Sequence, residues 1–165
     1  RERAAMEKAV LGYLDTDLLC YRAVLPAETA KRQSDAWDPW LRWFENEFGA
    51  RLLTTEALQA LSQPAEAHSA ATGAVRKMDD MTLTALQLAA SLSGSLVLGL
   101  AFVVDAASPA QVFAAAHVEE SFKAEVYNEG KHGIAPHEEK RRAAFMRDLK
   151  AAQEFLKLLS LERVI

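Results

Sequence analysis

Apolar residues recur at helical spacing along most of the chain, and signals that start helices separate the runs. The first run covers residues 2–14, and the later runs follow a proline or an acidic or serine cap. Proline suits the first turn of a helix because its missing N–H would have no partner there, while a neighbouring Asp or Ser accepts bonds from free backbone N–H groups. We therefore predict that further helices begin near six positions: Pro26, Pro39, Pro64, Asp79 or Asp80, Pro109 and Pro136.

The segment Trp37-Asp38-Pro39 predicts a new helix that starts at Pro39. Aromatic residues follow at helical spacing up to Phe48, and Gly49 stands where a left-handed cap would end the helix. All three tryptophans of the chain lie between Trp37 and Trp43. Aromatic stripes at this spacing are typical of a core, so we expect the tryptophans to be buried. The alternative is a patch that faces a partner, because Trp is enriched at interfaces.

The most apolar stretch runs from Leu83 to Val104, and its length raises the question of a membrane span. A spanning helix needs about 20 predominantly apolar residues, but polar residues and glycines interrupt this stretch, and neither an aromatic belt nor a basic flank brackets it. We therefore expect a buried central helix. Ser91, Ser95 and Gly99 recur every four residues, which predicts a narrow face where another helix backbone comes close.

Two short apolar segments, Leu18 to Val24 and Leu52 to Thr55, are candidates for strands that pair as a hairpin. A chain of 165 residues, half of them hydrophobic, is expected to form one domain around one core. The predicted fold class is thus mostly α, a helical bundle with a central apolar helix and at most one short β-hairpin, in a single domain over residues 1–165.

Charge and cysteine content exclude several classes of protein. The formal net charge is −4 and the sequence pI is about 5.6, and the short basic runs are interleaved with acids, so nucleic acid is not an expected partner. Cys20 is the single cysteine and cannot form an internal disulfide. Because it lies between Leu19 and Tyr21, we expect it to act as a small buried hydrophobe.

Candidate catalytic groups are sparse. The chain lacks a His-Glu-x-x-His zinc motif, a phosphate-binding glycine loop and a nucleophile elbow. Glu129 and His132 have the spacing found in di-iron bundles, but the second such pair is missing. Two further groups could bind a metal only loosely, because adjacent side chains diverge around a helix. One is His117 with Glu119 and Glu120, and the other is His137 with Glu138 and Glu139. We therefore predict no enzyme activity, no metal site and no cofactor.

A resemblance extends over nearly the whole chain. It rests on Asp15-Thr16-Asp17-Leu18-Leu19-Cys20-Tyr21-Arg22, followed by Pro26, Gln33, Trp37-Asp38-Pro39, Trp43 and Gly49, then on Ser93-Gly94-Ser95-Leu96-Val97-Leu98-Gly99-Leu100-Ala101 and Glu119-Glu120-Ser121-Phe122. This order and spacing resemble the family of assembly chaperones that attend the α subunit of the F-type ATP synthase catalytic head. One departure is Tyr127-Asn128, where the family commonly has Trp-Gly.

The resemblance implies a helical C-terminal domain of a longer protein, whose N-terminal β-rich domain is absent here. It implies a soluble chaperone of the bacterial cytoplasm or the mitochondrial matrix that binds the unassembled α subunit and prevents its aggregation. Glu119 and Glu120 match the family's acidic helix and are the first candidates for partner contact, with Trp37, Asp38 and Arg22 as further candidates. We expect Arg22 to pair with Asp15 or Asp17.

Two other functions stay open at this point. A helical domain that senses a small molecule would need a pocket lined by the tryptophans. A carboxylate and histidine metal enzyme would need additional ligands from outside this chain.

Overall fold

The computed structural model describes residues 2–126, 133 and 135–162, and helix dominates them. The α-helices are α1 (Glu2–Leu11), α2 (Ala27–Phe48), α3 (Ala65–Arg76), α4 (Asp80–Ser93), α5 (Leu96–Val103), α6 (Pro109–Ala116), α7 (Val118–Val126) and α9 (Pro136–Glu162). Two 3-10 turns, Leu14–Thr16 and Leu18–Cys20, link α1 to α2. The predicted mostly α fold is confirmed.

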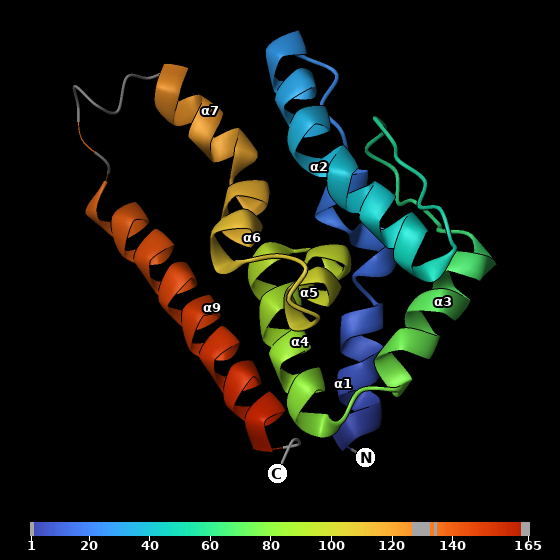
Figure 1. Ribbon diagram of the computed structural model, residues 1–165. Helices are drawn as coiled ribbons and strands as arrows, with labels where there is room; N and C mark the ends of the chain where they lie inside the picture. Colours follow the sequence, from blue (N-terminus) through green and yellow to red (C-terminus); the bar gives the residue numbers. More distant parts are fainter. Residues whose placement is uncertain (1, 127–132, 134, 163–165) are drawn as a thin grey trace.

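Helix α4 is the centre of the bundle. It packs against α5 most extensively, and also against α1, α6 and α9. Figure 1 shows α9 and α1 on opposite sides of α4, with α3 on the far side of α1 and α2 in the upper part of the view. No helix in the described part of the chain is both long enough and apolar enough to cross a membrane.

The apolar stretch from Leu83 to Val104 is central, as predicted, but it is two helices and not one. The break lies at Gly94, whose φ of 70° ends α4 in the left-handed conformation, and Ser95 then caps α5 by accepting a bond from the Leu98 N–H. Gly94-Ser95 thus combines a helix stop with a helix start. The predicted face of Ser91, Ser95 and Gly99 does not form, because Ser91 is exposed on α4 and Ser95 caps α5. A close helix approach does occur at Gly99, but between α5 and α4, since a Cβ there would lie 3.2 Å from the backbone nitrogen of Ala90.

Helix α2 also differs from the prediction, because it runs unbroken through Pro39 from a start after Pro26. A proline inside a helix removes one backbone bond and crowds the preceding turn. Pro39 and Asp35 are both exposed, so the carbonyl freed by this missing bond lies on the solvent side, while buried Trp37 and Phe44 anchor the opposite face. The predicted end at Gly49, with φ of 67°, is confirmed.

The other predicted helix starts are confirmed with their caps. Asp79 accepts a bond from the Thr82 N–H, and Ser108 forms a capping box with Gln111. Pro64 and Pro136 stand at the starts of α3 and α9.

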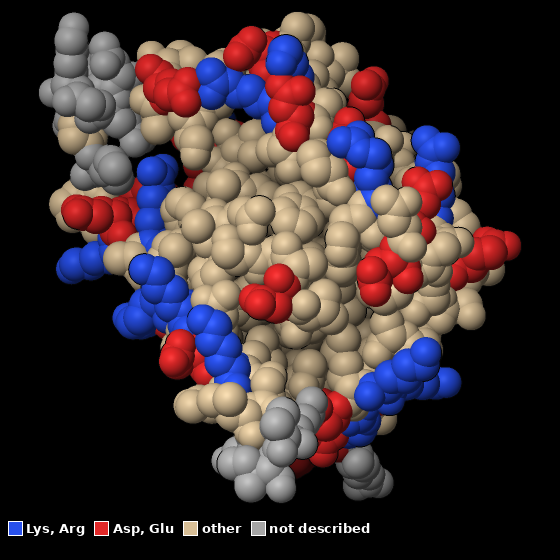
Figure 2. Space-filling model, viewed as in Figure 1, with Lys and Arg blue, Asp and Glu red and all other residues tan. Residues whose placement is uncertain are grey.

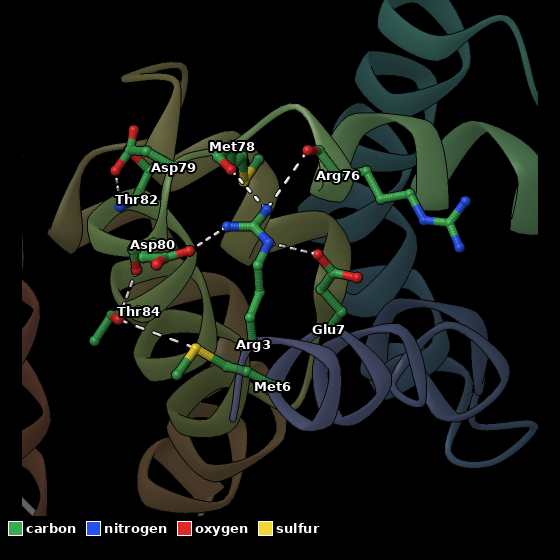
Figure 3. Close-up of polar contacts among 9 residues, drawn as sticks. All are labelled: Arg3, Met6, Glu7, Arg76, Met78, Asp79, Asp80, Thr82 and Thr84. Atoms are coloured by element: carbon green, nitrogen blue, oxygen red, sulfur yellow. Dashed lines mark hydrogen bonds and ion pairs between the residues drawn. The ribbon is translucent and has the colours of Figure 1, made fainter. Parts of the chain in front are cut away.

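Arg3 ties the start of α1 to the turn between α3 and α4 (Figure 3). Its guanidinium donates to the carbonyl of Met78 at 2.7 Å and pairs with Glu7 at 2.8 Å and with Asp80. Arg76 contributes its backbone carbonyl to this cluster, whereas its own guanidinium points away from it.

The predicted hairpin is replaced by a single parallel bridge between Tyr21 and Thr55. The Arg22 N–H donates to the Thr55 carbonyl, and the Thr55 N–H donates to the Cys20 carbonyl, both at 2.8 Å. The two segments therefore do pair, but α2 separates them in sequence and they run in the same direction, which a hairpin does not allow.

Candidate functional site

The two longest motifs of the resemblance meet in the core, around the carboxylate of Asp17. This side chain is completely buried and accepts bonds from the N–H groups of Leu19 and Val97, each at 3.1 Å. The Leu18 N–H donates to the Gly94 carbonyl at 2.9 Å. Burial raises the pKa of Asp17 to about 6. Because Val97 lies in the first turn of α5, the carboxylate also faces the positive end of that helix.

Gln63 joins the same region to the segment after α2, and no sequence motif pointed to it. Its buried side-chain amide accepts from the Leu53 N–H at 2.9 Å and donates to the Leu53 carbonyl at 3.0 Å. Its backbone N–H donates to Asp15, which also contacts His68. Cys20 lies next to Gln63 and is buried as predicted, and this burial raises the pKa of its thiol to about 12.

Three of the five predicted contact residues form one cluster. Arg22 pairs with Asp38 at 2.7 Å, and its guanidinium lies 5.3 Å from the ring centre of Trp37. The expected pairing of Arg22 with Asp15 or Asp17 is wrong, because α2 brings Asp38 within reach while Asp17 is enclosed by backbone donors.

Trp37 belongs to the core. It is 1% exposed and donates from Nε1 to the Ala115 carbonyl at 2.8 Å, which fixes α2 against α6. Trp40 and Trp43 are partly buried against the same core. The prediction that the tryptophans are buried in the core is confirmed for Trp37, whereas Trp40 and Trp43 pack against the core and remain partly exposed.

The two remaining predicted contact residues, Glu119 and Glu120, lie on α7 and point to different helices. Glu119 accepts from the side-chain amide of Gln33 on α2 at 2.7 Å, and Glu120 pairs with Arg141 on α9 at 2.6 Å. The amide oxygen of Gln33 in turn accepts from the Ala23 N–H at 2.7 Å. All five predicted contact residues therefore lie along or beside the contacts of α2 with α6 and α7.

Further polar contacts hold α7, in which no residue is buried. Arg32 of α2 pairs with Glu125 at 2.7 Å and lies 4.8 Å from the ring centre of Phe122. This pairing lowers the pKa of Glu125. Helix α7 is thus bridged to α2 and α9 through the ends of long side chains.

His117, between α6 and α7, is nine-tenths buried and stacks on Phe113. Its Nδ1 lies 2.9 Å from the Phe113 carbonyl, and its Nε2 lies 3.6 Å from Glu120. Glu119 turns away toward α2, so the grouping of His117 with both glutamates does not converge on one point. Among the residues described, no three His, Cys, Asp or Glu side chains are placed to share a metal ion. Glu129, His132, Tyr127 and Asn128 lie outside the described residues.

The surface has two hollows beside α2. One, of about 530 Å³, lies between α2, α3 and α5 and has a largely apolar lining that includes Phe48, Met78, Leu100 and Val104. The other, of about 700 Å³, lies between α2 and residues 51–54. On the face drawn in Figure 2, charged side chains concentrate near the rim, and few occupy the middle, where Figure 1 places α4, α5 and α6.

Comparison with known proteins gives consistent results. Residues 1–45 match the family model described as ATP12 chaperone protein. The crystal structure of Atp12 from Paracoccus denitrificans superposes with a TM-score of 0.85 at 28% identity, over 93% of this chain and 64% of that one. A single-substitution mutant of the same Atp12p gives a TM-score of 0.86 at 28% identity, over 94% and 64%.

A third structure, the Atu1473 protein of Agrobacterium tumefaciens, gives a TM-score of 0.86 at 34% identity, over 95% of this chain and 57% of that one. The chain thus spans less than two thirds of the length of these proteins. The matches cover nearly all of its helices and include the Asp15 to Arg22 motif. The chain is therefore similar to the ATP12 chaperone family, through the family model over residues 1–45 and through the fold of Atp12 over nearly its whole length.

Proposed function

We propose that this chain acts within an assembly chaperone of the F-type ATP synthase, where it binds the unassembled α subunit of the catalytic head and prevents its aggregation. The observation that carries the proposal is the similarity of more than nine-tenths of the chain to Atp12. A chaperone of this kind covers an apolar interface with lower affinity than the final partner, here the β subunit, so that assembly displaces it. The proposal includes no catalytic step and no cofactor, and it places the protein in the bacterial cytoplasm or the mitochondrial matrix.

The proposed contact surface follows the seam between α2 and α7. Glu119 is exposed and the side chain of Asp38 is 44% exposed, so these carboxylates can face a client. The side chain of Glu120 is 37% exposed, but its Oε2 is buried, so its Oε1, which pairs with Arg141, is the oxygen nearer to the surface. Arg22 and Trp37 are 11% and 1% exposed and act by holding Asp38 and α2 in place. Acidic groups at a rim steer a basic partner and raise the association rate more than the affinity.

A holdase also needs an apolar surface that can cover the subunit interface of its client. The apolar hollow between α2, α3 and α5 is such a surface. Its lining combines apolar side chains with Glu47 and Lys77, an arrangement typical of interfaces that have an apolar centre and a polar rim.

The experiment measures how well the full-length protein suppresses aggregation of free α subunit. A simple charge reversal at Glu120 would break its pair with Arg141, so the informative variant is the exchange Glu120→Lys with Arg141→Glu, which keeps a pair of opposite charges between α7 and α9. We expect weaker suppression, with a larger deficit at low salt, and an unchanged circular dichroism spectrum. The single variant Arg141→Glu is the control for loss of the pair.

Full suppression by the exchanged variant would remove Glu120 from the contact surface. Failure of the wild-type protein to suppress aggregation at any salt concentration would overturn the proposed function itself.

A further inference from the structure

The segment after α2 forms an isolated parallel bridge at Thr55, and its backbone has one bonded edge and one free edge. Along the chain, the backbone groups of successive residues in an extended strand point to opposite edges. The N–H and carbonyl of Leu53 both bond to the amide of Gln63, and those of Thr55 both bond to the segment 20–22. Leu53 and Thr55 therefore use the same edge.

Leu52 and Thr54 alternate with these residues, so their backbone groups point to the other edge. Neither residue has a backbone hydrogen bond with any residue that the structure describes. Proteins usually cover or disrupt such an edge, because it is a template for pairing with another chain.

One face of α2 lies opposite this strand. After Gly49 the chain turns back and runs beside α2 (Figure 1), and the hollow of about 700 Å³ between them is lined by Asp38, Leu41, Arg42 and Glu45 from the helix and by residues 51–54. The four helical residues follow the i, i+3, i+4, i+7 spacing of a single helix face. A groove between a strand edge and a helix is a site where an extended peptide can add as a further strand.

We propose that this groove binds an extended, acidic segment of a client polypeptide by strand addition at Thr54, which is exposed, whereas Leu52 is 5% exposed and belongs to the core. The inference rests on the proposed function for the source of the segment, which is the unassembled α subunit. Main-chain bonding suits a chaperone because every extended polypeptide offers the same donors and acceptors.

The charges in the groove favour an acidic segment. Asp38 is already paired with Arg22, whereas Arg42 and Arg51 have no ion-pair partner among the described residues, and Glu45 is the one other carboxylate in the lining. Two free guanidinium groups therefore face one free carboxylate, and guanidinium binds carboxylate in a bidentate manner.

The main test compares Thr54→Pro with Thr54→Ala in the full-length protein. Proline removes the Thr54 N–H from the free edge without breaking a bond in the chain, and the extended residue before it suits a proline. We expect the proline variant to capture the α subunit at least tenfold more weakly than the alanine variant, with the same melting temperature. Equal capture by the two variants would overturn the inference.

Amide hydrogen exchange of the exposed residue Thr54 gives a second readout. We expect fast exchange in the protein alone and slow exchange when the client is bound. Slow exchange without client would mean that another part of the protein covers the edge. If the protein forms a dimer, and Thr54→Pro abolishes the dimer without affecting capture of the client, the edge binds a second copy of the chain. Either result overturns the inference.

The charge preference is tested with a double variant that combines Arg42→Glu and Arg51→Glu. The control is the single variant Arg76→Glu, which lies on α3 outside the groove. Capture should fall several-fold in the first variant only, and equal capture would overturn the acidic preference. If the wild type captures no α subunit, the proposed function fails, and the edge is then tested with a peptide that alternates Thr and Glu. If the wild type binds this peptide and the Thr54→Pro variant does not, the result supports strand addition at the edge. If the wild type does not bind the peptide, the result overturns the inference.

Discussion

Helices α5 and α7 are nearly equal in length, with eight and nine residues, but they are held by different contacts. Every residue of α5 except Val103 is buried, whereas α7 has no buried residue. Buried Asp17 and Ser95 accept bonds from the backbone N–H groups that begin α5. The contacts of α7 with α2 and α9 use charged or amide groups at the ends of long side chains, such as Glu119, Glu120 and Glu125.

This difference separates the part that defines the fold from the part that can move. A buried donor that loses its acceptor has no water to replace it, so the contacts of α5 are costly to break. The pairs of Glu125 with Arg32 and of Glu120 with Arg141 are partly exposed and are screened by salt, whereas Glu119 bonds to the buried amide of Gln33. We therefore expect the contacts of α7 to open more readily than those of α5, and the predictions below test this contrast.

The largest effect should come from the pH dependence of Asp17. Its pKa is raised to about 6 by burial, above its unfolded value of 3.8. The folded state therefore binds an extra proton between about pH 4 and pH 6, and the free energy of unfolding should fall as pH rises through this window. The full loss should be on the order of 3 kcal/mol, of which about half lies between pH 5 and pH 7.5, where urea denaturation measures it.

The control for this prediction is Asp17→Asn, which cannot titrate. Its stability should lack this fall between pH 5 and pH 7.5, while the contributions of the other carboxylates remain. A variant with the same pH slope as the wild type would show that titration of Asp17 does not cause the fall in stability.

The second effect should come from the close contact of α5 with α4 at Gly99. A Cβ there would lie 3.0 Å from Leu86 and 3.2 Å from Ala90, whereas a Cβ at Gly73 on α3 meets nothing within 4 Å. Gly99→Ala should therefore destabilise the protein by about 1 to 2 kcal/mol through overpacking. Gly73→Ala should be neutral or stabilise by up to about 1 kcal/mol, because Ala favours helix more than Gly. Thermal denaturation of the pair measures the difference, and equal shifts would contradict the close contact.

The sequence predicted the parts of the fold that depend on local signals. The caps at Asp79 and Ser108 and the stop at Gly49 each involve neighbouring residues, so their chemistry can be identified without a tertiary structure. Pro39 misled the prediction because packing of Trp37 and Phe44 outweighs the local cost of proline. Gly94-Ser95 was missed because the apolar residues on both sides of it gave one continuous pattern.

The candidate site was predicted in its residues but not in its contacts. The motif at Asp15 to Arg22 and the motif at Ser93 to Ala101 were both identified, but the bond between Asp17 and Val97 spans 80 residues, and no local pattern encodes it. Arg22 was paired with the wrong aspartate for the same reason. Gln63 lies in no motif, and a single buried amide leaves no periodic signal.

The third prediction concerns α7 and uses two neighbouring cations of α2. Arg32 reaches Glu125 and Phe122 on α7, whereas Lys31 pairs only within α2, with Asp35. Arg32→Ala should speed amide hydrogen exchange in α7 several-fold and leave the melting temperature almost unchanged. Lys31→Ala should alter neither quantity. If Arg32→Ala lowers the melting temperature as much as Gly99→Ala does, α7 belongs to the same cooperative unit as α5.

The smallest effect should be a loosening of α7 in acid, with a sign opposite to that of Asp17. Arg32 of α2 lowers the pKa of Glu125 on α7 through their ion pair. A carboxylate with a lowered pKa in the folded state stabilises it above the ordinary carboxylate value, and this contribution disappears as pH falls through the folded pKa. Amide exchange in α7, corrected for the intrinsic effect of pH, should therefore accelerate below about pH 4, while α5 stays protected because protonation of Asp17 favours its burial. Equal protection of both helices at low pH would show that side-chain pairs contribute little to the position of α7, and that its packing on α2 holds it there.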